Sequence, residues 1–201
     1  MFDFRTRADI EADGADRLPA GSSYVRLPMP YPARSEDLRV LIRDAVPEQM
    51  KELFGAGKAA AMMARSAAGL VRERREPYRV FLSELASGPS APALFHCSAG
   101  KDRAGWAGSL VLLTLGVEEE QVVEQYLLSN RDLDGIRRRL HDAGDVGWGH
   151  LLAPFLEVRR EYIESSFAAV RADWGSIDRY LDLGLGISGE LRERLRAWLL
   201  E

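Results

Sequence analysis

The chain has 201 residues, of which 46% are hydrophobic and 29% charged, and its formal net charge is −4 at pH 7. These values are typical of one globular domain with a full hydrophobic core, and the weak negative charge argues against bulk nucleic-acid binding. The single cysteine excludes an internal disulfide, so we expect a reducing, cytoplasmic location that keeps the thiol free.

Neither a signal peptide nor a membrane span is predicted. The first five residues include the charged Asp3 and Arg5 and lack an apolar core region, and the longest apolar run, 106–117, is shorter than the roughly 20 residues that cross a bilayer. We therefore expect no membrane insertion.

The first half of the chain predicts short strands between helices. Strands are expected at 2–6 and 24–28, a loop or short helix at 10–19, and helices at 50–70, broken at Gly55 and Gly57, and at 77–86. The second half is predicted to be mostly helical.

Residues 104–115 are apolar nearly all round, which predicts a central buried helix ended by Gly116. Further helical patterns lie at 118–129, at 133–141, at 153–174 and after the capping residues Ser176 and Ser188, with a loop at 144–149. The combination predicts a single α/β domain over 1–201, with a short, mostly parallel sheet flanked by helices and a helix-rich C-terminal half.

The stretch 94–105 reads LFHCSAGKDRAG and carries the only cysteine. An apolar strand, a small glycine-containing loop and a helix N-terminus in that order form an anion site, because loop N–H groups converge and the helix dipole adds partial positive charge. Arg103, six residues after Cys97, offers a planar charged fork that matches two phosphate oxygens. A thiolate at Cys97 would be stabilised there.

The segment His96–Arg103 resembles the His-Cys-(x)5-Arg signature of protein tyrosine phosphatases. Its Ala-Gly-Lys-Asp-Arg run is similar to the bacterial branch that includes dual-specificity and phosphoinositide-active members. Similar segments occur in the same order at 3–6, 27–28, 126–130 and 174–187, so the resemblance covers nearly the whole chain.

This resemblance implies a cysteine-phosphatase-like fold. Relative to the family, the chain is expected to lack a strand-and-helix region ahead of the segment 3–6. Such a loss would expose a strand edge and favour self-association.

The resemblance and the loop chemistry give Cys97 the role of nucleophile, against the alternative of a buried structural thiol. Arg103 would hold phosphate oxygens and tighten on the transition state. His96 would shape the loop and favour the thiolate. The same phosphate oxygens would accept hydrogen bonds from the backbone amides of Ser98, Ala99, Gly100, Lys101, Asp102 and Arg103.

Asp102 is the best candidate for the general acid that protonates the leaving oxygen, although it could instead orient Arg103 through a salt bridge. In relatives an additional acid lies soon after the Leu-Pro segment, and the nearest acids here are Glu36 and Asp37. Lys101 would add a point charge, and the resemblance implies a role in holding a further phosphate group; the alternative is a solvated lysine.

Ala104 departs from the family, in which serine or threonine usually follows the arginine and helps the sulfur to leave. We expect slower hydrolysis of the phosphocysteine, about 10-fold if one hydrogen bond of ~1.5 kcal/mol is missing.

The sequence thus predicts a phosphatase that works without a metal or organic cofactor. Its three histidines show no metal-ligand pattern. Phosphotyrosine is the default substrate, and phosphoserine, phosphothreonine and phosphoinositides remain open. The second hypothesis is a catalytically weak or inactive phosphate-binding module. A third hypothesis, an arsenate reductase or rhodanese-like thiol enzyme, is less well supported, because arsenate reduction usually needs further cysteines.

Overall fold

The computed structural model describes residues 1–30, 47–88, 92–131 and 149–200. Three short parallel strands form one sheet in the order β2–β1–β3. They are β1 (Phe2–Asp3), β2 (Val25–Arg26) and β3 (Phe95–His96). The predicted parallel sheet is confirmed, and its register sets Phe2 opposite Phe95 and Asp3 opposite His96.

The strand β1 and the residues after it have a different chemistry on each face, because successive side chains of an extended chain point to opposite sides. Phe2 and Phe4 pack edge-on against Phe81, with ring centroids 5.1 and 5.4 Å apart. Asp3 and Arg5 are buried too, but they bind each other and polar neighbours. The sheet therefore has an apolar face toward the helices and a polar face opposite.

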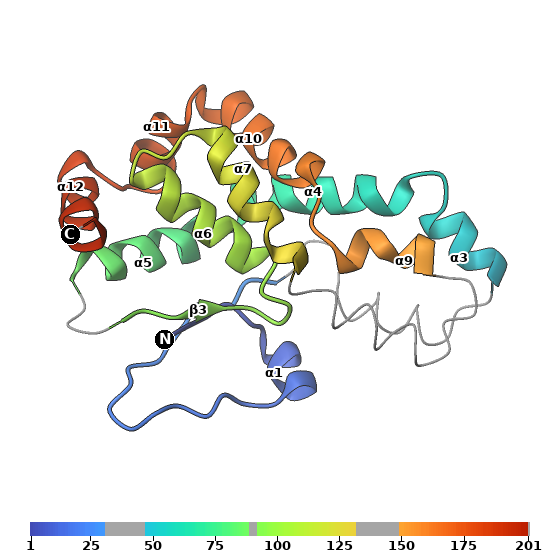
Figure 1. Cartoon of the computed structure of the whole chain (residues 1–201), viewed down its shortest axis with the longest axis horizontal. Helices are drawn as coiled ribbons and strands as arrows, with labels where there is room; N and C mark the ends of the chain where they lie inside the picture. Colours follow the sequence, from blue (N-terminus) through green and yellow to red (C-terminus); the bar gives the residue numbers. More distant parts are fainter. Residues whose placement is uncertain (31–46, 89–91, 132–148, 201) are drawn as a thin grey trace.

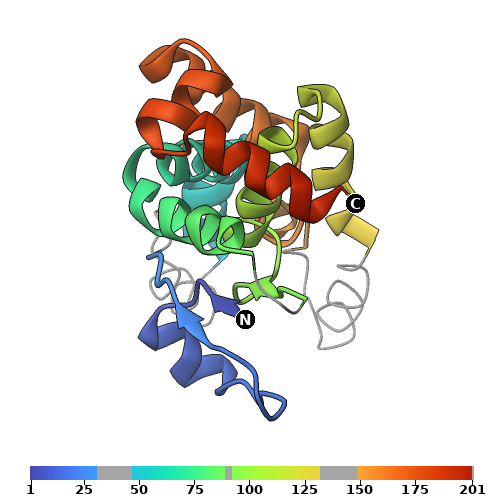
Figure 2. The same ribbon diagram turned by 90° about the vertical axis from the view of Figure 1, so that its left-hand side faces the viewer.

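Helices make up most of the described chain. They are α1 (Arg7–Asp13), α3 (Pro47–Phe54), α4 (Lys58–Glu73), α5 (Arg75–Ala86), α6 (Arg103–Thr114), α7 (Glu119–Leu127), α9 (Gly149–Leu156), α10 (Arg160–Trp174), α11 (Ile177–Arg179), the π-helix η1 (Tyr180–Gly184) and α12 (Gly189–Leu199). The helices from α4 onward gather on one side of the strands, and α1 lies on the other side (Figures 1 and 2). None of the helices in the described part of the chain is both long and apolar enough to cross a membrane.

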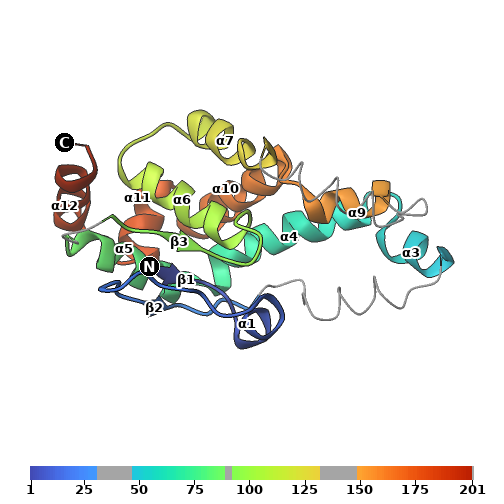
Figure 3. The same cartoon turned by 60° about the horizontal axis from the view of Figure 1, so that its bottom comes forward.

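The helix α6 occupies the centre of the helical layer, as its all-round apolar sequence predicts. Trp106, Ala107 and Leu110 are buried in the main core with the sheet phenylalanines. A second, smaller cluster lies away from the sheet, where α3 and α9 pack on α4 (Figure 3). Its buried members are Met50, Phe54, Ala59, Met63, Leu151, Phe155 and Tyr162.

One predicted helix is divided in the structure. The pattern over 153–174 belongs to α9 and α10, which are separated by Glu157–Arg159. Asn130 explains the break, because its side chain bonds both the N–H and the C=O of Val158, at 2.9 and 2.8 Å. Those backbone groups therefore need no helical partners.

Other expectations are met or fall outside the description. The break at Gly55 and Gly57 is confirmed, since α3 ends at Phe54 and α4 begins at Lys58. The stretch 10–19 contributes its first residues to α1. The expected helix at 133–141, the loop at 144–148 and the two acids Glu36 and Asp37 lie outside the described residues.

Candidate active site

The loop 97–102 connects β3 to α6 and carries the predicted cysteine. Gly100 has φ 71°, a left-handed conformation that glycine adopts without steric cost, and it turns the chain toward the helix. Ser98, Ala99 and Gly100 are exposed, whereas Cys97 is buried at the base of the loop. The first amides of α6 have no acceptor inside the helix, so they are free to bind an anion.

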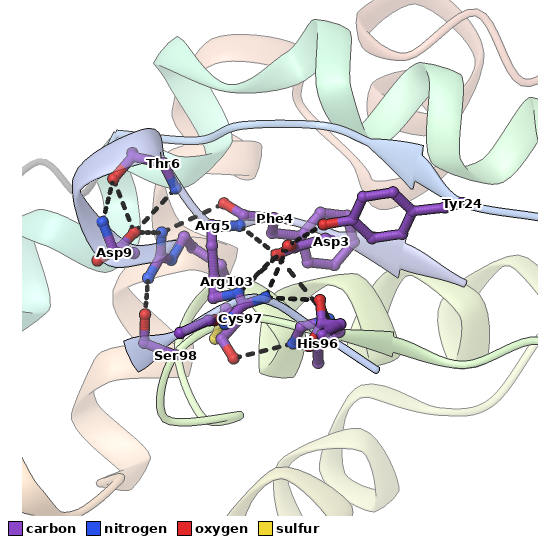
Figure 4. Close-up of polar contacts among 12 residues, drawn as sticks. Asp3, Phe4, Arg5, Thr6, Asp9, Tyr24, His96, Cys97, Ser98 and Arg103 are labelled. Atoms are coloured by element: carbon purple, nitrogen blue, oxygen red, sulfur yellow. Dashed lines mark hydrogen bonds and ion pairs between the residues drawn. The ribbon is translucent and has the colours of Figure 1, made fainter. Parts of the chain in front are cut away.

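Arg103 is buried beside Cys97 and held by oxygen atoms (Figure 4). Its Nη1 donates to Asp9 Oδ2 at 2.7 Å and to the carbonyls of Met29 and Phe4 at 3.1 and 3.2 Å. Its Nη2 is 3.4 Å from Ser98 Oγ on the loop. Burial opposes the charged form, but the negative charges of Cys97 and Asp9 outweigh it and raise the pKa of Arg103.

Asp9 is a site residue that sequence reasoning missed. It forms a capping box with Thr6 at the start of α1, and its Oδ2 accepts from the Thr6 N–H and hydroxyl, both at 2.9 Å. Burial alone would raise the pKa of Asp9, but hydrogen bonds from Arg103 and Thr6 lower it. The only sequence signal was the capping pattern Thr6-x-x-Asp9, which does not reveal a bond to residue 103.

Asp102 and Lys101 pair with each other. Lys101 Nζ lies 3.3 Å from the Asp102 carboxylate and 3.3 Å from the carbonyl oxygen of Glu157, between α9 and α10. Lys101 is only 4% exposed, so it is not the solvated lysine of the alternative interpretation. The salt bridge to Arg103 that was considered for Asp102 is made by Asp9 instead.

His96 lies on the polar face of the sheet, beside Asp3 (Figure 4). Its Nδ1 is 3.3 Å from the Cys97 carbonyl oxygen, and its Nε2 is 3.3 Å from Asp16 Oδ2 and 3.9 Å from Asp3 Oδ1. These three side chains are close enough to be considered as metal ligands. Arg5 already binds both carboxylates, at 3.0 Å to Asp3 and 2.5 Å to Asp16, so the group is an ion-pair network.

Tyr24 completes this network, because its hydroxyl donates to Asp3 Oδ2 at 2.6 Å. Burial and the Asp3 carboxylate together raise the pKa of Tyr24 to about 12. Burial would raise the pKa of Asp3, but hydrogen bonds from Arg5 and Tyr24 lower it. Asp3 is therefore an anion fixed behind the loop.

The underside of the loop rests on the main core. The hydroxyl of the buried Tyr78 donates to the Arg103 carbonyl oxygen at 3.0 Å. The sequence predicted Tyr78 on the apolar face of its helix but gave no sign of this bond. Ala104 is buried and presents only a methyl group where the family usually has a hydroxyl.

Comparison with known proteins agrees with this geometry. The chain is 38% identical over 109 residues to a Cupriavidus necator protein named as a tyrosine-protein phosphatase. The aligned segment covers 53% of this chain and 39% of that protein. It is 28% identical to the triple specificity protein phosphatase PtpB of Mycobacterium tuberculosis, across all of this chain and 81% of PtpB. A tyrosine-protein phosphatase of Nostoc commune is 32% identical over 36% of this chain and 24% of its own length.

The match therefore spans less than half the length of the Cupriavidus necator and Nostoc commune proteins. A family model described as the tyrosine phosphatase family matches residues 1–201. A match over that whole length, on a chain whose loop brings a cysteine and a buried arginine together, makes this protein a member of the tyrosine phosphatase family.

Proposed function

We propose that the protein hydrolyses phosphate monoesters through Cys97, with phosphotyrosine as the default substrate. The observation that carries this proposal is the loop 97–102, which ends beside a buried Arg103 whose position is fixed by Asp9. A dianionic phosphate could receive the outward edge of the guanidinium and the loop amides together.

In the proposed reaction the Cys97 thiolate attacks phosphorus. A sulfur–phosphorus bond forms while the phosphorus–oxygen bond to the leaving group breaks, and Asp102 gives that oxygen its proton. Water then attacks the phosphocysteine and gives a proton to the Asp102 carboxylate, the sulfur–phosphorus bond breaks, and inorganic phosphate leaves with the thiolate and the Asp102 acid restored. Arg103 and the loop amides bind the equatorial oxygens in both steps.

The surroundings of Lys101 bear on whether a substrate with a second phosphate group could bind. Its ammonium group lies against the Glu157 carbonyl, so contact with a second phosphate requires that the side chain leave this carbonyl. Similarity to a protein named a triple specificity phosphatase supports testing phosphoserine, phosphothreonine and phosphoinositides beside phosphotyrosine. A cytoplasmic location, and self-association through β3, which is the last strand of the sheet among the described residues, belong to the same proposal.

The deciding experiment is hydrolysis of p-nitrophenyl phosphate and of a phosphotyrosine peptide by the wild type and by Cys97→Ser. We expect turnover by the wild type and none by Cys97→Ser, which should still bind the peptide because Arg103 and the loop amides remain. Equal turnover by both proteins would remove Cys97 from the mechanism. A phosphoinositide panel on the same samples ranks the substrate classes.

The second candidate function is a phosphate-binding module with little or no turnover. The buried methyl group of Ala104 and the pairing of Asp102 with Lys101 favour it, because both reduce the groups free to assist the second step. A module of this kind would bind the phosphotyrosine peptide and release no phosphate. If Ala104→Thr then gained turnover, the missing hydroxyl would be the cause.

A further inference from the structure

The ring of His96 lies between oxygen atoms on both sides. The Cys97 carbonyl oxygen, 3.3 Å from Nδ1, can only accept, so Nδ1 must carry a hydrogen for that contact to be attractive. In a neutral imidazole Nε2 would then be a bare acceptor. Nε2 is buried, makes no hydrogen bond among the described residues, and has the carboxylates of Asp16 and Asp3 at 3.3 and 3.9 Å.

These contacts favour a His96 ring with a hydrogen on each nitrogen, and the charges of the surrounding network favour it as well. Among the described residues, the charged and titratable groups that face His96 are Asp3 at the end of β1, Arg5 after it, Asp16 from the α1–β2 connection, Tyr24 ahead of β2, and the adjoining Cys97. Asp3 and Asp16 bring two negative charges and Arg5 one positive charge. The remaining negative charge is neutralised when His96 is an imidazolium.

We propose that Asp16 is a positioning residue for the Cys97 reaction, and that it holds His96 as an imidazolium directly behind the loop. The proposal rests on the proposed function and adds a residue to it. Asp3 is already saturated by Arg5 and Tyr24, whereas the Asp16 carboxylate has Arg5 and His96 as its partners. Asp16 therefore controls the His96 charge, and the His96 charge stabilises the thiolate.

The first test measures the protonation of the His96 ring in the absence of substrate. The chain has three histidines, so a full-length protein with His141→Gln and His150→Gln retains only His96. We expect ¹⁵N chemical shifts at pH 7 to show hydrogens on both ring nitrogens of His96, and Asp16→Asn to convert the ring to the neutral form. A neutral His96 in the parent protein would overturn the proposal.

The second test measures the reactivity of the Cys97 thiol as a function of pH. Cys97 is the only cysteine, so its alkylation by iodoacetamide reports on that thiolate alone. We expect Asp16→Asn to move the pH profile of alkylation, and the acid limb of kcat/KM, to higher pH by about one unit. The sign is decisive: if His96 kept its charge, removing a nearby carboxylate would stabilise the thiolate and move both profiles to lower pH.

Two further variants separate this role from a loss of structure. Asp16→Glu should restore the wild-type profile, because it returns the carboxylate. Glu11→Gln removes an exposed carboxylate from α1, whose partner is Arg7, and should change neither the His96 shifts nor the profiles. An unchanged His96 spectrum in Asp16→Asn would overturn the proposal even if activity fell.

The two proposals can fail separately. If His96 and Cys97 respond as expected but no phosphate ester is hydrolysed, the proposed function is wrong and the Asp16 assignment stands. If turnover is normal while His96 is neutral, the Asp16 assignment is wrong and the function stands.

Discussion

Asp9 fixes the direction of the Arg103 fork from 94 residues away. Asp9→Asn keeps an acceptor but leaves the buried guanidinium without its carboxylate partner, and we expect a loss of about 2–3 kcal/mol in the free energy of unfolding. The kcat/KM for a phosphotyrosine peptide should fall as well, because the guanidinium is no longer aligned. Urea unfolding and steady-state kinetics measure both, with Glu11→Gln as the control.

The acid dependence of stability tests this ion pair together with the one between Asp3 and Arg5. The pKa values of Asp3 and Asp9 are lowered in the folded protein from the ordinary value of 3.8, so the folded state releases these protons more readily than the unfolded chain. Their stabilisation is present above the unfolded value and is lost as pH falls through the folded values. The urea concentration at the unfolding midpoint should therefore decrease as the pH is lowered below about 4. This decrease should be less steep in Asp9→Asn.

The role of Asp102 can be tested through the leaving group. Loss of a general acid harms a poor leaving group most, because a good one departs without a proton. We expect Asp102→Asn to lower kcat on a phosphotyrosine peptide by roughly 10²-fold or more and to affect p-nitrophenyl phosphate much less. Equal losses on both substrates would assign Asp102 to loop structure, through its contact with Lys101.

At the scale of elements, two glycines in α6 form a matched pair. A Cβ on Gly105 would lie 3.0 Å from the Tyr126 ring of α7, whereas one on Gly108 would be 3.7 Å from Phe95. Gly108→Ala should therefore gain about 0.5–1 kcal/mol from helix propensity. Gly105→Ala should lose about 1–2 kcal/mol as α7 is pushed away. Urea unfolding compares them, and equal gains would show that α6 and α7 are not closely packed.

The elements also show what the sequence could predict. The strand–loop–helix around Cys97 was predictable because adjacent residues determine it: an apolar lead-in, small residues, and an apolar helix after Arg103. The break between α9 and α10 was not, because Asn130 makes it from another part of the chain.

The same reasoning applies inside the site. The nucleophile loop was visible as a pattern. Asp9 reaches Arg103 from α1, Asp16 reaches His96 from the connection after α1, and Tyr78 reaches the Arg103 carbonyl from α5. No local spacing encodes those contacts. The burial of Lys101 was likewise unpredictable, since its partner carbonyl belongs to Glu157.

At the scale of the whole molecule, the two hydrophobic clusters should respond differently to mutation. Phe155 packs edge-on against Phe54 in the smaller cluster, at 5.1 Å between ring centroids, whereas Phe81 is fully buried in the main core. Phe155→Ala should lower hydrogen-exchange protection mainly in α3, α9 and the start of α4. Phe81→Ala should lower it throughout. A uniform loss in both variants would show that the clusters open together.

The bonds of Arg103 also determine when this site can form. The acceptors of its Nη1 belong to Phe4, Asp9 and Met29, which precede it by 99, 94 and 74 residues. Closing a chain segment of that length carries an entropic cost that nearby contacts do not, and such contacts slow folding. During synthesis the first thirty residues must therefore wait for α6 to emerge from the ribosome before the anion site exists. Phosphate or vanadate, bound only by the finished site, should then favour the joining of the two ends of this long segment.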